Sequence, residues 1–358
     1  MAKRVDGQMA LSLQQKIQDP TQGVYLIGTT PPKDGTDETK LAVIADKLLS
    51  RLHDVEYDGF IVYDIQDESS RIAAPRPFPF KKTVDPRAYS QLLRQLSNTD
   101  VITYKSVAQR DVSAFKQWLQ ETENSYQLNN IVLVGSPSCT GQIKLNLPDA
   151  YRAVKEDDNQ LFLGGVTIAE RHAKKRNEHQ RLFDKTKQGC ELFISQAVYD
   201  AQATVDLLTS YAQLCREHNT KAKRVILTFT PCGGEKTLEF MRWLGISVPP
   251  TTQTRILAAA NPLGESVTIC HENLNMILQQ CGHLEVPLGL NIESLTNRKS
   301  EIDASVDLYR MLKDTMQSYL AGNVIANQNQ LSEDTNDWPV YQTLNANSPI
   351  KAVTSSAI

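Results

Sequence analysis

The sequence lacks the features that would place the protein at a membrane or on a nucleic acid. No stretch approaches the roughly 20 consecutive apolar residues that cross a bilayer, and residues 1–22 contain no apolar core of a secretory signal. The formal net charge is −3, so there is no basic excess of the kind that nucleic acids attract. We therefore expect a cytoplasmic protein with neither a nucleic-acid nor a membrane partner.

Cysteine pairs and metal-ligand spacing are also absent. The 6 cysteines are scattered without a Cys-x-x-Cys pair, which is typical of reduced, buried thiols in a long chain without an export signal. His172 and His179 have no third ligand nearby, so we expect no metal site. The segments 233–237 and 135–138 are incomplete versions of a P-loop and a nucleophile elbow.

What the sequence does contain is a repeated alternation of apolar runs and helical segments. The runs are apolar at consecutive positions, as are parallel strands covered on both faces. Helical spacing of apolar residues follows at 40–52, 204–215 and 303–319, and Asp37 and Ser113 suit helix starts. The expected strands span 24–28, 59–64, 101–105, 130–135, 161–168, 191–196, 224–229 and 286–293. Eight strand–helix units predict an α/β protein, a (β/α)8 TIM barrel.

The main alternative is a doubly wound open sheet, which usually carries a glycine-rich dinucleotide turn after its first strand. Here that turn reads Gly28-Thr29-Thr30-Pro31-Pro32-Lys33. We therefore favour the barrel, over residues 23–320, with an N-terminal extension at 1–22 and a polar C-terminal tail at 321–358.

The segment between the seventh and eighth expected strands is long enough for extra helices. We place these helices near 251–260 and 266–280. In a barrel of this kind the loops at the C-terminal ends of the strands line the site. The residues at those ends are polar and include both acids and bases, so we expect a small-molecule site there.

Several of these strand ends carry short motifs in a fixed order. Each alone is a weak signal, but together they cover about residues 20–318. The motifs are Ile27-Gly28-Thr29-Thr30-Pro31-Pro32-Lys33, Glu68-Ser69-Ser70-Arg71, Ile168-Ala169-Glu170-Arg171-His172, Lys185 before Gln188-Gly189-Cys190, Ser195-Gln196-Ala197-Val198-Tyr199-Asp200, and Leu290-Asn291-Ile292. In this order they resemble the methylenetetrahydrofolate reductase family of flavin-dependent barrel enzymes.

The resemblance implies a cofactor site. His172, Glu178 and Lys185 fall where the family contacts the diphosphate and ribityl parts of FAD, and we assign Thr103 to the same cofactor. NAD(P)H would then be the hydride donor. The alternative for these residues is a solvated helix face, because several basic residues surround them.

The resemblance also implies folate contacts. The Gln196 amide can pair with a pterin edge through one donor and one acceptor. Phe240 matches an aromatic residue that packs on the substrate, with Lys236 one helical turn before it, although a lone phenylalanine on a helix is more often part of the core. Ser136 stands where the family has its pterin-reading aspartate.

The sequence departs from the family at its catalytic acid. The glutamate of the first strand aligns with Gly28, and the arginine of the eighth strand aligns with Ile292. If another acid substitutes, Asp64 and Glu170 are our candidates, both at strand ends. Partial burial would raise the pKa of Asp64 into a useful range. The alternative for Asp64 is a loop cap or an ion-pair partner.

Two functions remain open at this point. One is a reductase that passes hydride from NAD(P)H, through a flavin, to 5,10-methylenetetrahydrofolate and yields 5-methyltetrahydrofolate. The other is a folate- or flavin-binding barrel without reductase activity, acting as a sensor, carrier or partner subunit. Both functions require Glu170, His172 and Gln196 to face one cavity, and the sequence leaves a homo-oligomer open.

Overall fold

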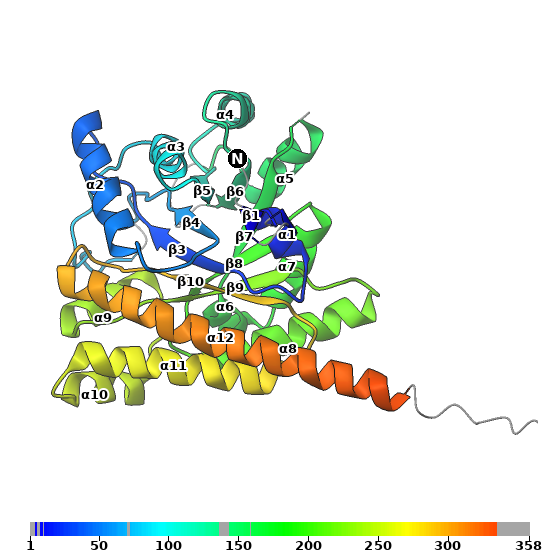
Figure 1. Cartoon of the computed structure of the whole chain (residues 1–358). Helices are drawn as coiled ribbons and strands as arrows, with labels where there is room; N and C mark the ends of the chain where they lie inside the picture. The colour runs from blue at the N-terminus through cyan, green and yellow to red at the C-terminus, as the bar shows by residue number, and fades with distance from the viewer. Residues whose placement is uncertain are drawn as a thin grey trace, which may run out of the picture.

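Eight parallel strands close into a barrel at the centre of the molecule, as the computed structural model shows (Figure 1). The structure describes residues 4–5, 8–9, 11–69, 72–135, 143–157 and 159–334, with side chains from 11 to 322 within those ranges. The strands are β3 (Tyr25–Thr29), β4 (Gly59–Val62), β5 (Asp100–Ser106), β6 (Asn130–Val134), β7 (Phe162–Thr167), β8 (Leu192–Ala197), β9 (Arg224–Phe229) and β10 (Leu288–Ile292). Their order around the barrel is β10-β3-β4-β5-β6-β7-β8-β9, so the predicted TIM barrel is confirmed.

Helices cover the outside of the barrel. They are α2 (Glu38–Arg51), α3 (Pro86–Ser97), α4 (Val112–Asn124), α5 (Leu147–Glu156), α6 (Ala169–Lys175), α7 (Glu178–Lys187), α8 (Ala201–Glu217), α9 (Glu235–Leu244), α10 (Pro250–Ala258), α11 (Pro262–Cys281) and α12 (Lys299–Asp334). Helices α10 and α11 are the extra helices expected between the last two strands. Helix α12 lies alongside α11 and continues past residue 320, where we expected a polar tail to begin (Figure 1).

The first helix of the barrel begins where the sequence predicts. The Asp37 carboxylate accepts a hydrogen bond from the Lys40 amide at 2.9 Å, as an N-cap does. The expectation for Ser113 is wrong by two positions, because Asp111 caps α4 and accepts from the Ala114 amide at 2.8 Å. Asp111 is three residues before the Ala114 amide and takes the capping position, whereas Ser113 lies inside the first turn of α4.

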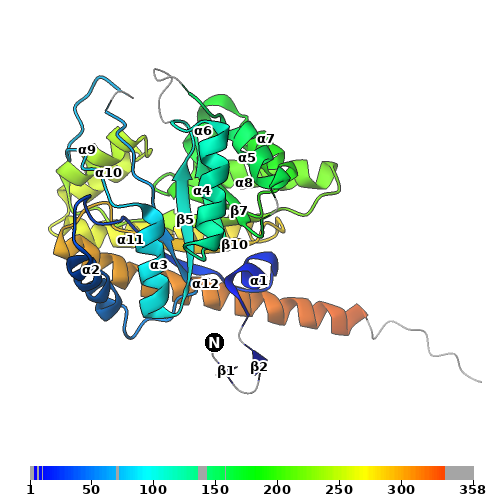
Figure 2. The same ribbon diagram turned by 90° about the horizontal axis from the view of Figure 1, so that it is seen from above.

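The N-terminal extension closes the bottom of the barrel. A short hairpin of β1 (Arg4–Val5) and β2 (Gln8–Met9) precedes α1 (Leu13–Gln18), which lies below the strands (Figure 2). Leu13 and Ile17 pack into the apolar interior of the barrel. The Arg224 side chain, 1% exposed, donates to backbone carbonyls of Ile17 at 3.0 Å and Lys16 at 3.2 Å, and to those of Asp19 and Leu288. This one guanidinium therefore joins α1 to strands β9 and β10.

The interior changes in character along the barrel axis. Its lower and middle layers are aliphatic, with Leu26, Ile61, Ile102, Val132 and Ile226 all fully buried. Side chains two residues further along a strand point to the same face, so the next inward positions lie at the C-terminal end. There the aliphatic side chains give way to aromatic and polar ones.

Three expectations from composition can be compared with the structure. None of the described helices is long and apolar enough to cross a lipid bilayer. Within the described residues no group of three histidine, cysteine or acidic side chains could hold a metal ion. The described cysteines are buried free thiols, as predicted: Cys190, Cys215, Cys232, Cys270 and Cys281.

Candidate functional site

Four side chains from three strands meet at the C-terminal end of the barrel interior. They are Tyr63, Tyr104, Asn291 and Glu293, which we call the mouth cluster. Each follows an inward-facing position by two residues, as Tyr63 follows Ile61. Tyr63 and Glu293 are half-buried and in contact with solvent, whereas Asn291 and Tyr104 are buried. The cluster therefore presents one carboxyl and one phenol at the place where barrel enzymes bind ligands.

A chain of hydrogen bonds joins the members of the mouth cluster. The Asn291 amide nitrogen donates to the Tyr63 hydroxyl at 2.9 Å and to the Thr228 hydroxyl at 3.1 Å. The Tyr63 hydroxyl in turn hydrogen-bonds with the Glu293 carboxyl. The Tyr104 ring packs edge-on against Tyr63, with ring centroids 4.9 Å apart. The buried amide oxygen of Asn291 accepts no hydrogen bond from the residues that the structure describes.

Burial gives the carboxyl of this cluster an unusual acidity. It raises the pKa of Glu293 from 4.5 to about 7, while the hydrogen bond from Tyr63 acts in the opposite direction. Burial, together with the nearby Glu293 charge, also raises the pKa of Tyr63 and Tyr104 well above 10. At neutral pH the phenols are therefore neutral, and Glu293 is the group of the cluster that exchanges protons.

Gly28 borders the cluster from strand β3. A Cβ atom at Gly28 would lie 2.8 Å from the Tyr63 hydroxyl, 3.0 Å from the Glu293 Cβ and 3.1 Å from the Asn291 amide oxygen. Any side chain at this position would therefore displace the cluster. Strand β3 has no acid at this position, and side chains from β4 and β10 fill the space instead.

Sequence reasoning missed Glu293 as a site residue. We named Asp64 and Glu170 as candidate acids, and Glu293 was only one of the polar strand-end residues, without a role of its own. The signal was its spacing, because Asn291 and Glu293 are two residues apart on a strand and so share the inward face.

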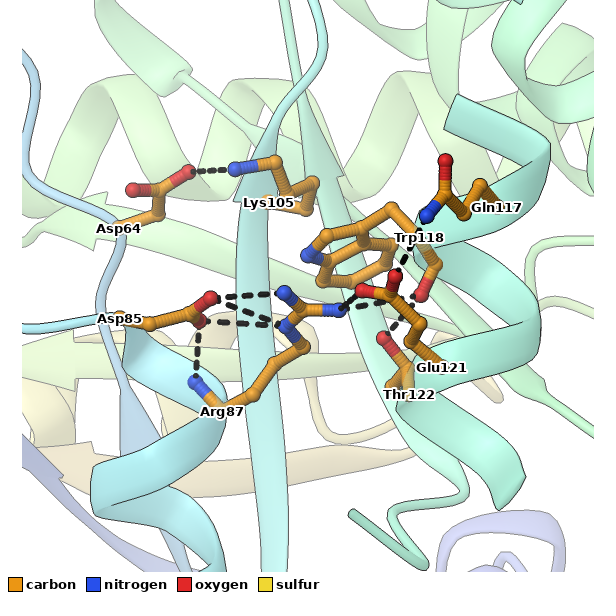
Figure 3. A network of polar contacts seen from close by, with 8 residues as sticks. All are labelled: Asp64, Asp85, Arg87, Lys105, Gln117, Trp118, Glu121 and Thr122. Atoms are coloured by element: carbon orange, nitrogen blue, oxygen red, sulfur yellow. Dashed lines mark hydrogen bonds and ion pairs between the residues drawn. The ribbon is translucent and has the colours of Figure 1, made fainter. Parts of the chain in front are cut away.

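Asp64 lies at the end of β4 and is fully engaged (Figure 3). Its carboxylate pairs with the Lys105 ammonium at 3.0 Å and accepts from the Ser106 amide at 2.8 Å and the Gln66 amide at 2.7 Å. The Lys105 ammonium also lies 5.6 Å from the centre of the Trp118 ring. Asp64 is thus an ion-pair partner, which was the alternative considered for it, rather than a free acid.

The same part of the barrel is held by a second cationic side chain. Figure 3 shows the Arg87 guanidinium beside Trp118, 5.3 Å from the ring centre, opposite the carboxylates of Asp85 and Glu121. Arg87 pairs with Asp85 at 2.8 Å and with Glu121 at 3.0 Å. These contacts join α3 to α4 on the outside of the barrel.

Glu170 and Gln196 line one small internal cavity, of about 10 Å³, enough for a single water molecule. Burial raises the pKa of Glu170, and its carboxylate accepts a hydrogen bond from the Ser247 amide at 3.0 Å. His172 is not among the lining residues. Its ring instead lies 3.3 Å from the Ser210 hydroxyl of α8. The expectation that all three share one cavity is therefore wrong for His172, which packs between helices.

An irregularity in β8 explains how Gln196 is oriented. The register against β9 shifts near the end of the strand, where the Ser195 hydroxyl accepts from the Thr228 amide at 2.9 Å in place of a ladder carbonyl. Such a bulge redirects the next side chain. The Gln196 amide nitrogen consequently donates to the Leu244 carbonyl at 3.2 Å. One of the two pairing groups assigned to the pterin is thus used within the protein.

The residues predicted to hold the FAD diphosphate are occupied by internal contacts. Lys185 is 7% exposed, donates its ammonium to the Val166 carbonyl, and has a pKa lowered by burial to about 8. Glu178 is fully buried and pairs with Arg171 at 3.1 Å and Arg181 at 3.2 Å. A diphosphate needs accessible donors, and the Lys185 ammonium is buried and already donates to the Val166 carbonyl.

The remaining two predicted residues do not add to such a site. Thr103 is fully buried and faces outward from β5, where its hydroxyl donates to the Ser90 hydroxyl of α3 at 2.8 Å. Ser136 lies outside the residues that the structure describes. The described residues of this predicted set are therefore all buried and offer a flavin dinucleotide no exposed donor, and the FAD assignment stays a prediction.

This arrangement leads to a spectroscopic prediction. We expect the protein purified without added cofactor to lack the flavin absorbance band near about 450 nm, because Lys185, Glu178 and His172 are engaged with protein groups. Soaking with FAD followed by gel filtration is expected to leave the protein colourless. A yellow protein with one flavin per chain would contradict this interpretation.

Phe240 and Lys236 of α9 belong to an aromatic group beside the mouth. Phe240 is buried, packs edge-on against Phe78 with ring centroids 5.2 Å apart, and lies 6.1 Å from the Trp243 ring. The Arg76 guanidinium lies 5.3 Å from the Phe240 ring centre. Lys236 is exposed, with its ammonium 5.0 Å from the Phe78 ring centre. Phe78, on the long loop after β4, thus contacts both of the predicted substrate residues.

Comparisons with known proteins bear on the family of the chain. No family model and no curated protein matches the sequence. Among solved structures, the chain is similar to an uncharacterized protein from Clostridium thermocellum that binds two copies of 5-methyl-5,6,7,8-tetrahydrofolic acid. The identity is 35% and the TM-score 0.73, over 85% of this chain and 99% of that chain.

More distant structural likenesses are weak. N-(5'-phosphoribosyl)anthranilate isomerase from Pyrococcus furiosus has a TM-score of 0.41 at 10% identity, over 81% of this chain and 99% of that one. Xanthomonas albilineans dihydropteroate synthase has a TM-score of 0.40 at 13% identity, over 82% and 92%. Neither likeness bears on function. At 35% identity over nearly all of its length, the Clostridium thermocellum protein shows the family, and this chain belongs to the same family as that protein.

Proposed function

We propose that this protein binds a reduced folate of the 5-methyltetrahydrofolate type at the C-terminal mouth of its barrel. The observation that carries the proposal is the family relation to a protein that binds this compound. The mouth is the place where barrels with parallel strands build their ligand sites.

The mouth cluster offers groups that match a reduced pterin ring. The Tyr63 ring gives a partly exposed aromatic surface on which a flat, partly apolar ring can pack. The amide oxygen of Asn291 and the carboxyl of Glu293 are hydrogen-bond acceptors, and a pterin edge carries N–H donors. An unpaired buried acceptor costs free energy that a bound donor would recover.

The other end of a folate carries a benzoyl ring and carboxylates. The group of Phe78, Phe240 and Trp243 supplies aromatic surface beside the mouth. The exposed side chains of Lys236 and Arg298 both lie near the Phe78 ring, at 5.0 Å and 5.9 Å from its centre. These cations are suited to the carboxylates of the folate tail.

Calorimetric titration with 5-methyltetrahydrofolate tests this proposal. We expect saturable binding by the wild-type protein, and at least about fivefold weaker binding by a Tyr63→Ala variant, because a stacked aromatic contact contributes roughly 1 kcal/mol or more. The matched control is Tyr57→Ala, a half-buried tyrosine that precedes β4 at the opposite end of the barrel. Absence of binding, or equal weakening by both variants, would contradict the proposal.

A reductase activity is the second candidate. In this case hydride from NAD(P)H would reduce 5,10-methylenetetrahydrofolate to 5-methyltetrahydrofolate, and the protein would be an NAD(P)H-dependent oxidoreductase. The observation that favours it is a proton-exchanging carboxyl, Glu293, at the mouth. The test is formation of 5-methyltetrahydrofolate from the methylene compound with NADH or NADPH, with and without added FAD. If no product forms under any of these conditions, the reductase activity is excluded and only the binding function remains.

A further inference from the structure

The resemblance to the reductase family would place an acid on β3, but in this protein the acid at the barrel mouth follows β10. Strand β3 offers only Gly28 at the inward position, whereas the Glu293 side chain enters the same space from the end of β10. The Glu293 Cβ lies 3.0 Å from the position that a Cβ on Gly28 would take. A carboxyl from either strand would therefore project from nearly the same point of the barrel.

The groups around Glu293 suit a side chain that alternates between its acid and its anion. Tyr63 from β4 hydrogen-bonds with the carboxyl, and Asn291 supports Tyr63 with a donated hydrogen bond of 2.9 Å. In such a chain each hydrogen bond polarises the next one. The Tyr63 hydroxyl is therefore already placed to donate to the carboxylate when Glu293 has lost its proton. Strand β3 contributes no charged group here, and β9 contributes the neutral Thr228.

The other carboxyl groups at strand ends do not combine these properties. Asp64 is held by the Lys105 ammonium at 3.0 Å and by two further donors. Glu170 faces a cavity of about 10 Å³, too small for a folate ring. Of these three carboxyl groups, Glu293 is the one that reaches both the barrel interior and solvent.

We propose that Glu293 is the acid–base residue of the mouth, which gives a proton to a ring nitrogen of the bound reduced folate and takes it back, with Tyr63 as its positioning residue. This inference rests on the proposed folate-binding function. In the forward direction the Glu293 O–H bond breaks, the nitrogen lone pair forms the N–H bond, and the carboxylate accepts from the Tyr63 hydroxyl. The carboxylate regains a proton from the ring nitrogen or from water at the open side of the mouth.

The proposal is tested by the pH dependence of 5-methyltetrahydrofolate binding between about pH 6 and 9. Binding that requires the protonated carboxyl loses affinity as the pH rises through the pKa of Glu293, which is about 7, and the loss approaches tenfold per pH unit above it. The titratable groups that face Glu293 are the phenols of Tyr63 and Tyr104, which stay neutral over this range. Calorimetry in buffers of different ionisation enthalpy should show proton uptake on binding at alkaline pH.

Glu293→Gln keeps the shape of the side chain but cannot titrate, and we expect its binding to be independent of pH and of the buffer. The matched control is Glu191→Gln, at the N-terminal end of β8 and paired with Lys223 at 2.7 Å, which should keep the wild-type profile. A wild-type profile in Glu293→Gln, or flat binding in the wild type, would overturn the proposal while leaving folate binding in place. Absence of wild-type binding at every pH would instead remove the proposed function.

Discussion

An Arg224→Met variant is expected to lose about 3–5 kcal/mol of unfolding free energy. The guanidinium is 1% exposed and donates to four backbone carbonyls, those of Ile17, Lys16, Asp19 and Leu288. Methionine keeps the apolar stem and removes every donor, so carbonyls at the bottom of the barrel lose their partners. Because a neutral side chain replaces the cation, the loss reflects unpaired carbonyls rather than an unpaired charge.

Chemical denaturation of the Arg224→Met protein measures this loss. The matched control is Arg152→Met, whose guanidinium side chain is 64% exposed in a pair with Asp149 and should change stability by less than about 0.5 kcal/mol. A loss below about 1 kcal/mol in Arg224→Met would show that α1 does not depend on this residue for closing the barrel.

A Gly28→Val variant is expected to bind 5-methyltetrahydrofolate about 100-fold more weakly, equivalent to about 2.7 kcal/mol. Its Cβ would lie 2.8 Å from the Tyr63 hydroxyl and 3.0 Å from the Glu293 Cβ, so both side chains must move. Overpacking costs the fold a further 1–3 kcal/mol or so, and the half-buried mouth can yield toward solvent. We therefore expect a folded protein with a disrupted site.

Titration and circular dichroism of the Gly28→Val protein separate these two effects. The matched control is Gly322→Val on α12, where an added Cβ meets no atom within 4 Å, and where binding should stay at the wild-type level. Unchanged affinity in folded Gly28→Val would place the ligand away from the mouth cluster.

The barrel could be predicted from the sequence because its signal is repeated. Buried parallel strands are apolar at consecutive positions, and runs such as 224–229 have that pattern between segments of helical spacing. The errors in the predicted fold concern the ends of helices. Asp111 takes the cap that Ser113 suits, and α12 continues past the point where the composition turns polar.

The site was less predictable, because its residues are defined by the direction in which they point. Thr103 was expected at a strand end, but it lies in the middle of β5. Odd and even positions of a strand face opposite sides, and its hydroxyl meets Ser90 outside the barrel. The bulge in β8 changes the partner of Gln196, which no sequence pattern indicates. The spacing from Asn291 places Glu293 on the inward face, but its closeness to Gly28 is visible only in the structure, where the ends of β10 and β3 meet.

A crystal structure of the protein grown with 5-methyltetrahydrofolate tests the central claim most directly. We predict a pterin ring at the C-terminal mouth, against the Tyr63 ring and within hydrogen-bond distance of Glu293. Full occupancy of the ligand elsewhere, with the mouth cluster unchanged and free of ligand, would contradict the account.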